Sequence, residues 1–256
     1  MALEQSTESA PNPTLDLRGT IVRDSAAMAA AVLAGPLHAE VPGCPGWTLA
    51  DLAFHMGWIQ RWATFIVNNG RPPTAEEVAA APTDPSLAAA YIAEGTAPLI
   101  AALDAADLDA PCWNFTRSNE VKGFWLRRQA HEVAAHRWDA EASIGDARPV
   151  EARIAADGID EFVTSIIGRV VGRAKPDTTA LVGDVHLHCT DTAGEWTFQL
   201  VDGALEVTTG HGKAAAAVRG AASDLLLFLY NRIPADRVEI FGDRALVDNW
   251  MSVLRI

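Results

Sequence analysis

The chain has 256 residues, 49% of them hydrophobic, and a formal net charge of −13 at pH 7. This charge disfavours nucleic acid or an anionic membrane surface as a partner, because both select for Lys and Arg. No run approaches the roughly 18 consecutive apolar residues of a membrane span. Residues 1–8 lack the basic start and apolar core of a secretory signal, so we expect a cytoplasmic protein. Three widely separated cysteines, Cys44, Cys112 and Cys189, suit a reducing compartment and ordinary thiols rather than a disulfide framework.

The first part of the chain has helical patterns. A loop rich in Pro and Gly precedes Thr48, which together with Asp51 has the pattern of a capping box at the start of a helix. A Pro-containing linker over 70–85 follows that helix, and Pro98 should kink or divide the next one. The predicted helices are about 20–34, a second one that begins at Thr48 and continues through Trp62, 86–106, 123–144 and 150–171.

After Pro176 the pattern changes to short strands with intervening turns. Asp202-Gly203 is a strong hairpin signal between two of these strands. Further helices are expected from Ser223 and over 245–254. The predicted strands are 180–190, 195–201, 205–208, 214–220 and 238–241. We therefore predict an α+β protein with a helical bundle over 15–172 and a small α+β domain over 177–256.

Residues 129–139 contain the pattern that is most informative about function. Glu132 and His136 lie four residues apart, so on a helix they share one face. His55 falls on the predicted second helix and is the best candidate for a third ligand. Two histidines and one carboxylate with an open position form the ligand set of a catalytic transition-metal site. His131 lies about 140° around the helix from His136 and should not share the site.

Several neighbouring side chains allow more than one interpretation. Asp139, one turn beyond His136, either orients a ligand imidazole or is a carboxylate on the helix surface. Cys44 is either an ordinary thiol or part of the site, because it immediately precedes the helix of His55. His186 and His188 alternate on a predicted strand. Since no third ligand is apparent nearby, we expect them on a solvent-facing sheet surface.

Three segments resemble the mycothiol-dependent maleylpyruvate isomerase family. They are the run 41–55, the motif 131–139, and the tail 224–250 with its Leu-Tyr-Asn-Arg and Phe-Gly-Asp sequences. The resemblance implies a DinB-like four-helix bundle that holds a divalent metal, for which we expect zinc. It assigns the metal to His55, Glu132 and His136, and mycothiol as thiol cofactor or co-substrate.

A metal of this kind favours the reactive thiolate form of an incoming thiol. The expected partners are therefore a small-molecule thiol and a small electrophilic substrate, in an isomerisation of the maleylpyruvate type or an S-transfer. Maleylpyruvate is a dianion and requires cations in its pocket. The resemblance places Arg232 in this role, with Arg237 and Arg244 as rivals; otherwise each is a surface ion pair or a solvated side chain.

Two other functions fit the same ligand set. Two histidines and a carboxylate also form the iron site of non-haem oxygenases. A metal that only stabilises a binding or regulatory protein is the non-catalytic alternative.

Overall fold

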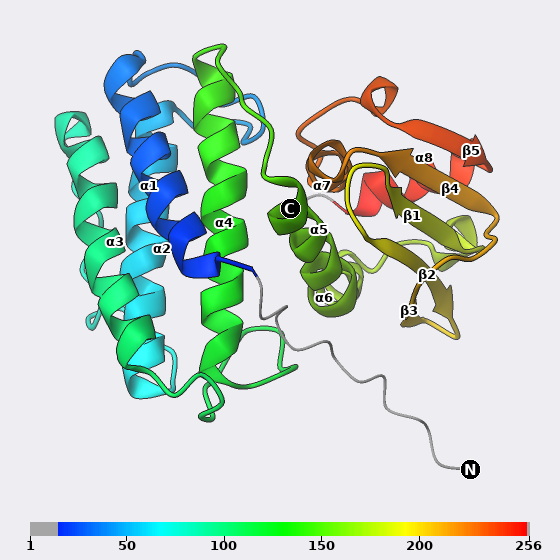
Figure 1. Cartoon of the computed structure of the whole chain (residues 1–256), viewed down its shortest axis with the longest axis horizontal. Coiled ribbons are helices and arrows are strands. Elements are labelled where there is room, and N and C mark those ends of the chain that lie inside the picture. Colours follow the sequence, from blue (N-terminus) through cyan, green and yellow to red (C-terminus); the bar gives the residue numbers. More distant parts are fainter. Residues whose placement is uncertain (1–14, 255–256) are drawn as a thin grey trace.

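The computed structural model describes residues 15–254 and places a helical bundle beside a smaller sheet domain (Figure 1). The residues at the N-terminus on which the expected localisation depends lie outside this range. Within the bundle, α2 packs against α3, and α1 packs against α4. The predicted α+β class with an N-terminal bundle is confirmed. The bundle consists of α1 (Leu17–Ala34), α2 (Leu49–Asn69), α3 (Ala88–Ala105) and α4 (Lys122–Ser143).

The start of α2 is held by the predicted capping box. The Asp51 N–H donates to the Thr48 hydroxyl over 3.2 Å, and the Thr48 N–H donates to the Asp51 carboxylate over 2.9 Å. The helix ends at Gly70, whose φ of 70° lies in the left-handed region that glycine tolerates best. Leu52, Ala53 and Met56 of this helix are fully buried, whereas His55 is half-buried.

Helix α4 buries many polar side chains along its length. An unpaired buried charge costs several kcal/mol, so these groups need partners. Arg137, for example, donates to Glu141 over 2.7 Å and to the carbonyl of Arg148 over 2.6 Å. The buried polar residues of α4 are Arg128, Gln129, His131, His136, Arg137, Asp139 and Glu141.

Helix α3 runs without interruption through Pro98, so of the two predicted effects, a kink or a division, division is wrong. The proline ring removes one backbone hydrogen bond, but α3 packs against both α1 and α2, which holds it in place. The segment Pro85–Ala105 is long and apolar enough to span a membrane by length and composition, with a mean hydropathy of 1.4. Its packing on α1 and α2 is that of a bundle helix, and a core helix passes the same test.

The predicted helix at 150–171 is present as one unbroken helical run over 152–174, with a change of helix type inside it. It consists of α5 (Ala152–Glu161), a π-helical turn over Phe162–Ile166, and α6 (Ile167–Ala174). Helix α5 packs against α7 (Ala222–Leu229) of the C-terminal part, and α6 contacts the strand β3 (Ala204–Thr209). The two helices thus lie between the bundle and the sheet (Figure 1). The domain boundary near residue 172 stays a prediction.

The C-terminal part is a five-stranded sheet in the order β3-β2-β1-β4-β5. The pair β1 and β4 is parallel, and the other neighbours are antiparallel. Helices α7 and α8 (Arg244–Val253) pack on this sheet. The strands are β1 (Val185–Cys189), β2 (Glu195–Val201), β3 (Ala204–Thr209), β4 (Ala216–Gly220) and β5 (Glu239–Gly242).

Two local predictions in the sheet have opposite outcomes. The Asp202-Gly203 hairpin is confirmed, because Val201 pairs with Ala204 and both turn residues have positive φ, at 52° and 79°. The first strand is shorter than predicted. It begins at Val185 rather than at residue 180, because Thr178–Leu181 forms a 3₁₀ turn that Asp177 caps through its side chain.

Candidate metal centre

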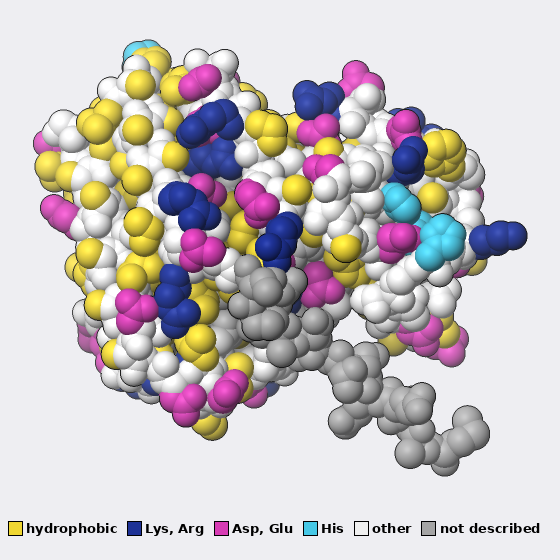
Figure 2. All heavy atoms as spheres, in the orientation of Figure 1, with side chains coloured by type: hydrophobic (Ala, Val, Ile, Leu, Met, Phe, Trp, Pro, Cys, Tyr) yellow, Lys and Arg dark blue, Asp and Glu magenta, His cyan; other side chains and the backbone are white. Residues whose placement is uncertain are grey.

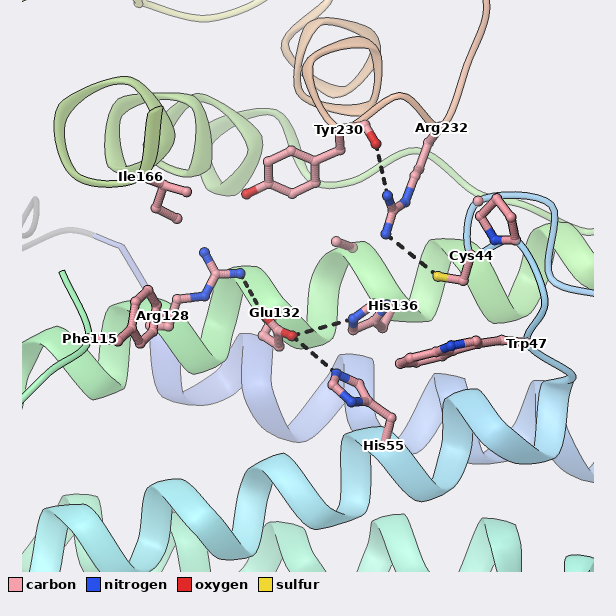
Figure 3. A pocket seen from close by; sticks show the side chains of 13 residues that line it. Cys44, Trp47, His55, Phe115, Arg128, Glu132, His136, Ile166, Tyr230 and Arg232 are labelled. Carbon is pink, nitrogen blue, oxygen red and sulfur yellow. Dashed lines mark hydrogen bonds and ion pairs between the residues drawn. The ribbon is translucent and has the colours of Figure 1, made fainter. Parts of the chain in front are cut away.

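A cavity of about 460 Å³ lies between α2, α4 and the C-terminal part of the chain. This is within the usual size range of small-molecule sites. Figure 3 shows side chains from the bundle and from the segment after α7 pointing into it. The cavity is lined by Gly43, Cys44, Pro45, Trp47, His55, Phe115, Arg128, Glu132, Ala135, His136, Ile166, Tyr230 and Arg232.

The structure brings the three expected ligands together. The Oε1 atom of Glu132 lies 3.5 Å from Nε2 of His55 and 3.4 Å from Nε2 of His136. One donor atom from each residue lies within 4.8 Å of the other two. In a tetrahedral zinc site with bonds of about 2.0–2.2 Å, neighbouring donors are about 3.3–3.5 Å apart. The observed separations to Glu132 therefore fit a divalent metal without a change of backbone.

The second oxygen of Glu132 is held by Arg128. Its guanidinium lies 2.5 Å from Oε2 of Glu132 and also binds Glu161 of α5. Burial alone would raise the pKa of Glu132, but Arg128 and the two histidines hold it well below its usual value. The glutamate is therefore an anion whose Oε1 faces the cavity.

Asp139 orients the second histidine. Its Oδ2 lies 2.9 Å from Nδ1 of His136, and the carboxylate is fully buried. An ionised carboxylate only accepts, so Nδ1 carries a proton, and Nε2, which faces Glu132, is the nitrogen that would bind a metal. Burial disfavours the charged imidazole, yet the hydrogen bonds to Asp139, Cys44 and Glu132 raise the pKa of His136 well above its usual value. Of the two interpretations of Asp139, the structure therefore supports the orienting carboxylate.

Arg232 lines the cavity and is nearly buried, with 7% of its side chain exposed. Its Nε donates to Asp139 over 3.1 Å, and its Nη1 donates to the Tyr230 carbonyl over 2.8 Å. The two rival arginines lie elsewhere. Arg237 is exposed beside Asp224, and Arg244 is exposed beside Asp248.

The three cysteines differ in environment. Cys44 lines the cavity, where its Sγ lies 3.5 Å from Oδ2 of Asp139. With His136 and Asp139 it forms a second group of potential metal donors that overlaps the first. Cys112 and Cys189 are buried away from the cavity, and burial raises the pKa of Cys189 to about 12, which keeps it a thiol.

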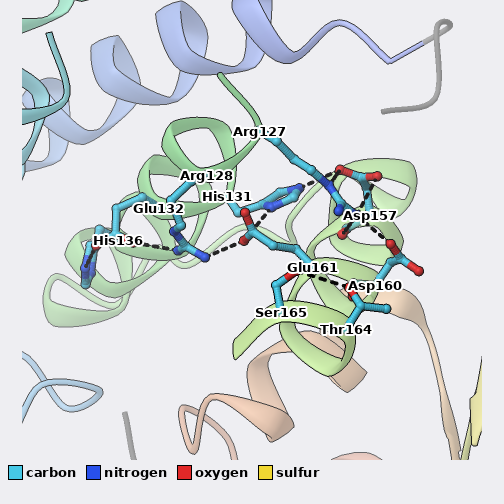
Figure 4. Close-up of polar contacts among 10 residues, drawn as sticks. All are labelled: Arg127, Arg128, His131, Glu132, His136, Asp157, Asp160, Glu161, Thr164 and Ser165. Carbon is cyan, nitrogen blue, oxygen red and sulfur yellow. Dashed lines mark hydrogen bonds and ion pairs between the residues drawn. The ribbon is translucent and has the colours of Figure 1, made fainter. Parts of the chain in front are cut away.

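His131 faces away from this cavity. It is fully buried, with Nδ1 3.0 Å from Glu161 and Nε2 2.9 Å from Asp157. Figure 4 shows it between α4 and α5, where Arg127 also reaches Asp157. His131 therefore belongs to the contact between these two helices.

Two polar side chains of the cavity, those of Arg128 and Tyr230, were not identified from the sequence. Arg128 precedes Glu132 by one helical turn, and this spacing was a usable signal for an ion pair. Tyr230 follows α7, and only the folded chain brings it to the cavity (Figure 3). Its hydroxyl is buried, and none of the described residues satisfies it with a hydrogen bond of ordinary geometry.

The prediction that His186 and His188 lie on a solvent-facing sheet surface is wrong. His186 is buried, with 5% of its side chain exposed, and two further potential ligands lie beside the pair. These are Glu195, on the neighbouring strand, and His211, beyond β3. The sequence did not show this group because His211 lies more than twenty residues away and joins it only through the sheet.

The fold and the site together define a class of protein in which helices of a bundle, here α2 and α4, carry a candidate metal centre. A small sheet domain closes one side of the cavity at this centre. Residues 19–141 match the family model of the mycothiol maleylpyruvate isomerase N-terminal domain, and residues 153–249 match the model of the C-terminal domain of that family. The chain belongs to the mycothiol-dependent maleylpyruvate isomerase family.

Solved structures show the same fold. A crystal structure of the mycothiol-dependent maleylpyruvate isomerase is similar with a TM-score of 0.60 and 12% identity, over 88% of this chain and 91% of that one. A variant of that isomerase with one histidine replaced by alanine is similar with a TM-score of 0.60 and 11% identity, over the same shares of both chains. No curated protein matches the chain significantly.

Proposed function

We propose that the protein is a mycothiol-dependent metalloenzyme that isomerises a small anionic electrophile of the maleylpyruvate type. The observation that carries this proposal is the convergence of His55, Glu132 and His136 on one wall of a cavity, with an open side toward the cavity interior. Family membership supports the dependence on mycothiol and the isomerase activity.

The donor set supports zinc as the metal. Two imidazole nitrogens and one carboxylate oxygen are ligands that zinc accepts, and three protein ligands leave a position for an exogenous ligand. When bound, such a metal supplies Lewis acidity that favours the thiolate form of an incoming thiol. His136 would bind the metal through Nε2, because Asp139 accepts the proton of Nδ1.

The charge of the cavity supports an anionic substrate. The protein as a whole carries a formal charge of −13, yet the ionised side chains that line the cavity include two arginines and only one carboxylate. Arg128 and Arg232 lie on the side of the cavity that faces the C-terminal part (Figure 3). Guanidinium groups pair with carboxylates through two parallel hydrogen bonds, so these two residues would bind the substrate carboxylates.

Tyr230 would complete this recognition. Its buried hydroxyl points into the cavity on the side of Arg128 (Figure 3), and burial raises the pKa of the phenol, so it stays protonated. A buried hydroxyl without a partner carries a free-energy cost that a ligand acceptor would relieve. Tyr230 would therefore donate to a carbonyl or carboxylate oxygen of the substrate.

The space around the cavity suits a long thiol. A hollow of about 1130 Å³ adjoins the cavity, and Phe115 and Ile166 line both. Trp62 and Trp113 line the hollow, and aromatic faces of this kind stack on the apolar faces of ligands. The remainder of the thiol would lie here while its sulfur reaches the donor set.

The test is incubation of the zinc-loaded protein with mycothiol and maleylpyruvate-type substrates, followed by mass spectrometry and spectroscopy of the products. An isomerase returns a product of unchanged mass and altered double-bond geometry. A conjugate with the mass of the thiol added indicates S-transfer instead. Stoichiometric iron together with oxygen consumption would identify an oxygenase and contradict the proposal.

The ligand assignment has its own test. His55→Ala and His136→Ala should each lose the bound metal and the thiol-dependent turnover together, because two donors cannot replace three. The matched control is His38→Ala, which removes an exposed imidazole outside the cavity. Stoichiometric metal that persists in the cavity of both site variants would refute the assignment.

A further inference from the structure

Three histidines and one glutamate gather on the surface of the sheet domain, in a cluster that shares no residue with the cavity. They are His186, His188, Glu195 and His211. Figure 2 shows histidine side chains beside an acidic side chain on this part of the surface. No step in the proposed function uses them, so the cluster needs its own explanation.

The sheet places three of these residues side by side. His186 and His188 alternate along β1, so their side chains leave the same face of the sheet. In the antiparallel pairing of β1 and β2, Glu195 lies opposite His188, and Thr197 lies opposite His186. Cross-strand neighbours of this kind have Cβ atoms about 4.5–5.5 Å apart. A rigid strand pair therefore holds two imidazoles and one carboxylate in contact.

The fourth residue arrives from the loop after β3. The Gly210 N–H donates to the Glu195 carbonyl over 2.9 Å, which ties this loop to the start of β2. Gly210 has a φ of 99°, a backbone conformation that favours glycine. The turn at Gly210 brings His211 over Glu195, where its Nδ1 lies 2.9 Å from Oε2.

The donor atoms converge as metal ligands do. Oε2 of Glu195 lies 3.0 Å from Nε2 of His186, 3.4 Å from Nδ1 of His188 and 2.9 Å from Nδ1 of His211. All four donor atoms lie within 4.8 Å of one another. A tetrahedral site with bonds of about 2.0–2.2 Å has edges of about 3.3–3.5 Å. The three edges to Glu195 are close to this length.

Thr197 supplies the orienting contact that a ligand histidine usually has. Its Oγ1 lies 2.9 Å from Nδ1 of His186. When the hydroxyl accepts the proton of Nδ1, Nε2 is left with its lone pair directed at the cluster. His186 is thus nearly buried, with Nδ1 on Thr197 and Nε2 facing the other donor atoms of the cluster.

The other ligands give access and room for adjustment. The exposed fraction of the side chain rises from 5% for His186 to 33% for His188 and 79% for His211. An ion can therefore enter from solvent, and the loop that carries His211 can close on it. Three imidazoles and one carboxylate fill all four positions of a tetrahedral ion, which is the pattern of a structural rather than a catalytic site.

We propose that His186, His188, Glu195 and His211 form a second divalent transition-metal site, for which zinc is the best fit, and that the ion fastens the loop after β3 to the pair β1 and β2. This site is independent of the candidate centre in the bundle. Its ion has no open position for a thiol, so its effect is on the stability of the sheet.

To test this proposal, the full-length protein and its His211→Ala and His188→Ala variants are loaded with zinc ions alone. The number of zinc ions bound per chain is then measured. Each variant should bind one zinc fewer per chain than the parent, whether or not the cavity in the bundle is filled. The exposed His211 packs in no core, so its variant should fold. His38→Ala is the matched control and should keep the zinc content of the parent.

Two further measurements distinguish a built site from loose surface binding. Thr197→Val removes the orienting hydroxyl without removing a ligand, and it should weaken the zinc affinity of this site about 10–100-fold. Zinc should also raise the melting temperature of a His55→Ala, His136→Ala double variant, and this rise should vanish when His211→Ala is added. Equal zinc stoichiometry and affinity in the parent, His188→Ala and His211→Ala would overturn the proposal.

Discussion

One buried carboxylate connects the bundle to the C-terminal part at the candidate centre. Oδ2 of Asp139 lies 2.9 Å from His136, and Oδ1 lies 3.1 Å from Nε of Arg232. Arg232 follows α7, nearly a hundred residues further along the chain. Burial would raise the pKa of Asp139, but His136 and Arg232 keep it below its usual value. The carboxylate thus orients a candidate ligand and a candidate substrate-binding residue together.

Asp139→Asn should lower the metal affinity of the cavity about 10–100-fold, the usual effect of losing the group that orients a ligand histidine. The asparagine amide keeps the shape of the carboxylate. It carries no negative charge, so it holds the proton on Nδ1 of His136 less firmly than the carboxylate does. Competition with a zinc chelator measures the change. Asp236→Asn, at an exposed carboxylate, is the control and should keep the affinity of the parent. Equal affinities in the two variants would contradict the orienting role.

Arg232→Lys should raise KM for a dianionic substrate by about 10–100-fold, because a hydrogen bond to a charged group contributes about 1.5–3 kcal/mol. Lysine keeps the charge but cannot offer two parallel N–H groups to a carboxylate. Steady-state kinetics with a dianionic substrate and with its monoester give the comparison. If Arg232→Lys raises KM for the monoester as much as for the dianion, Arg232 acts through Asp139 rather than on the substrate.

At the scale of single elements, α2 determines where the first candidate ligand stands. Its capping box fixes the first turn, and the loop immediately before it supplies Cys44 and Trp47 to the cavity. The Trp47 ring packs on His55 with centroids 4.8 Å apart. The orientation of the imidazole therefore depends on the start of the helix as well as on its core face.

Thr48→Ala should destabilise the protein by about 1 kcal/mol, the typical cost of losing an N-cap side chain. It should also weaken metal binding, since the loop with Trp47 loses its anchor at Asp51. Urea unfolding gives the first quantity and zinc titration the second. Thr48→Ser keeps the capping hydroxyl and should behave as the parent does. A Thr48→Ser variant as unstable as Thr48→Ala would show that the methyl group, not the cap, matters.

Helical spacing explains why part of the site could be predicted from the sequence. The helical period of α4 was enough to predict that Glu132 and His136 share a face. The prediction of His55 required only the pattern of α2 and the family resemblance. Tyr230 and His211 reach their clusters through tertiary contacts between distant segments, and no local pattern marks them. Pro98 does not divide α3, because the packing of α3 against α1 and α2 outweighs one lost hydrogen bond.

Across the whole molecule, an ionic network joins the bundle to the C-terminal part. From α4, Arg127 lies 2.9 Å from Asp157 and 2.7 Å from Asp160, while Arg128 binds Glu161 (Figure 4). Asp160 also accepts a hydrogen bond of 2.9 Å from the indole of Trp196 on β2. The same helix that presents Glu132 and His136 to the cavity is thus anchored to α5 and, through α5, to the sheet.

The carboxylate of Asp157 gives this network a measurable pH dependence. Burial raises its pKa, but His131 and Arg127 outweigh burial and lower the pKa from 3.8 to about 2. A lowered folded-state pKa stabilises the protein above the unfolded-state value, and the contribution is lost as the pH falls through the folded-state value. Its stabilisation should therefore be complete above about pH 4 and disappear between pH 4 and pH 2.

Asp157→Asn should lower the free energy of unfolding by about 2 kcal/mol at pH 7, the value that corresponds to the shift in pKa. The difference from the parent should shrink as the pH is lowered from 4 toward 2, because the parent then protonates the same group. Urea unfolding at a series of pH values measures both quantities. Asp109→Asn, at an exposed carboxylate of the bundle, should show neither effect. A pH-independent difference between Asp157→Asn and the parent would mean that shape rather than charge joins α4 to α5.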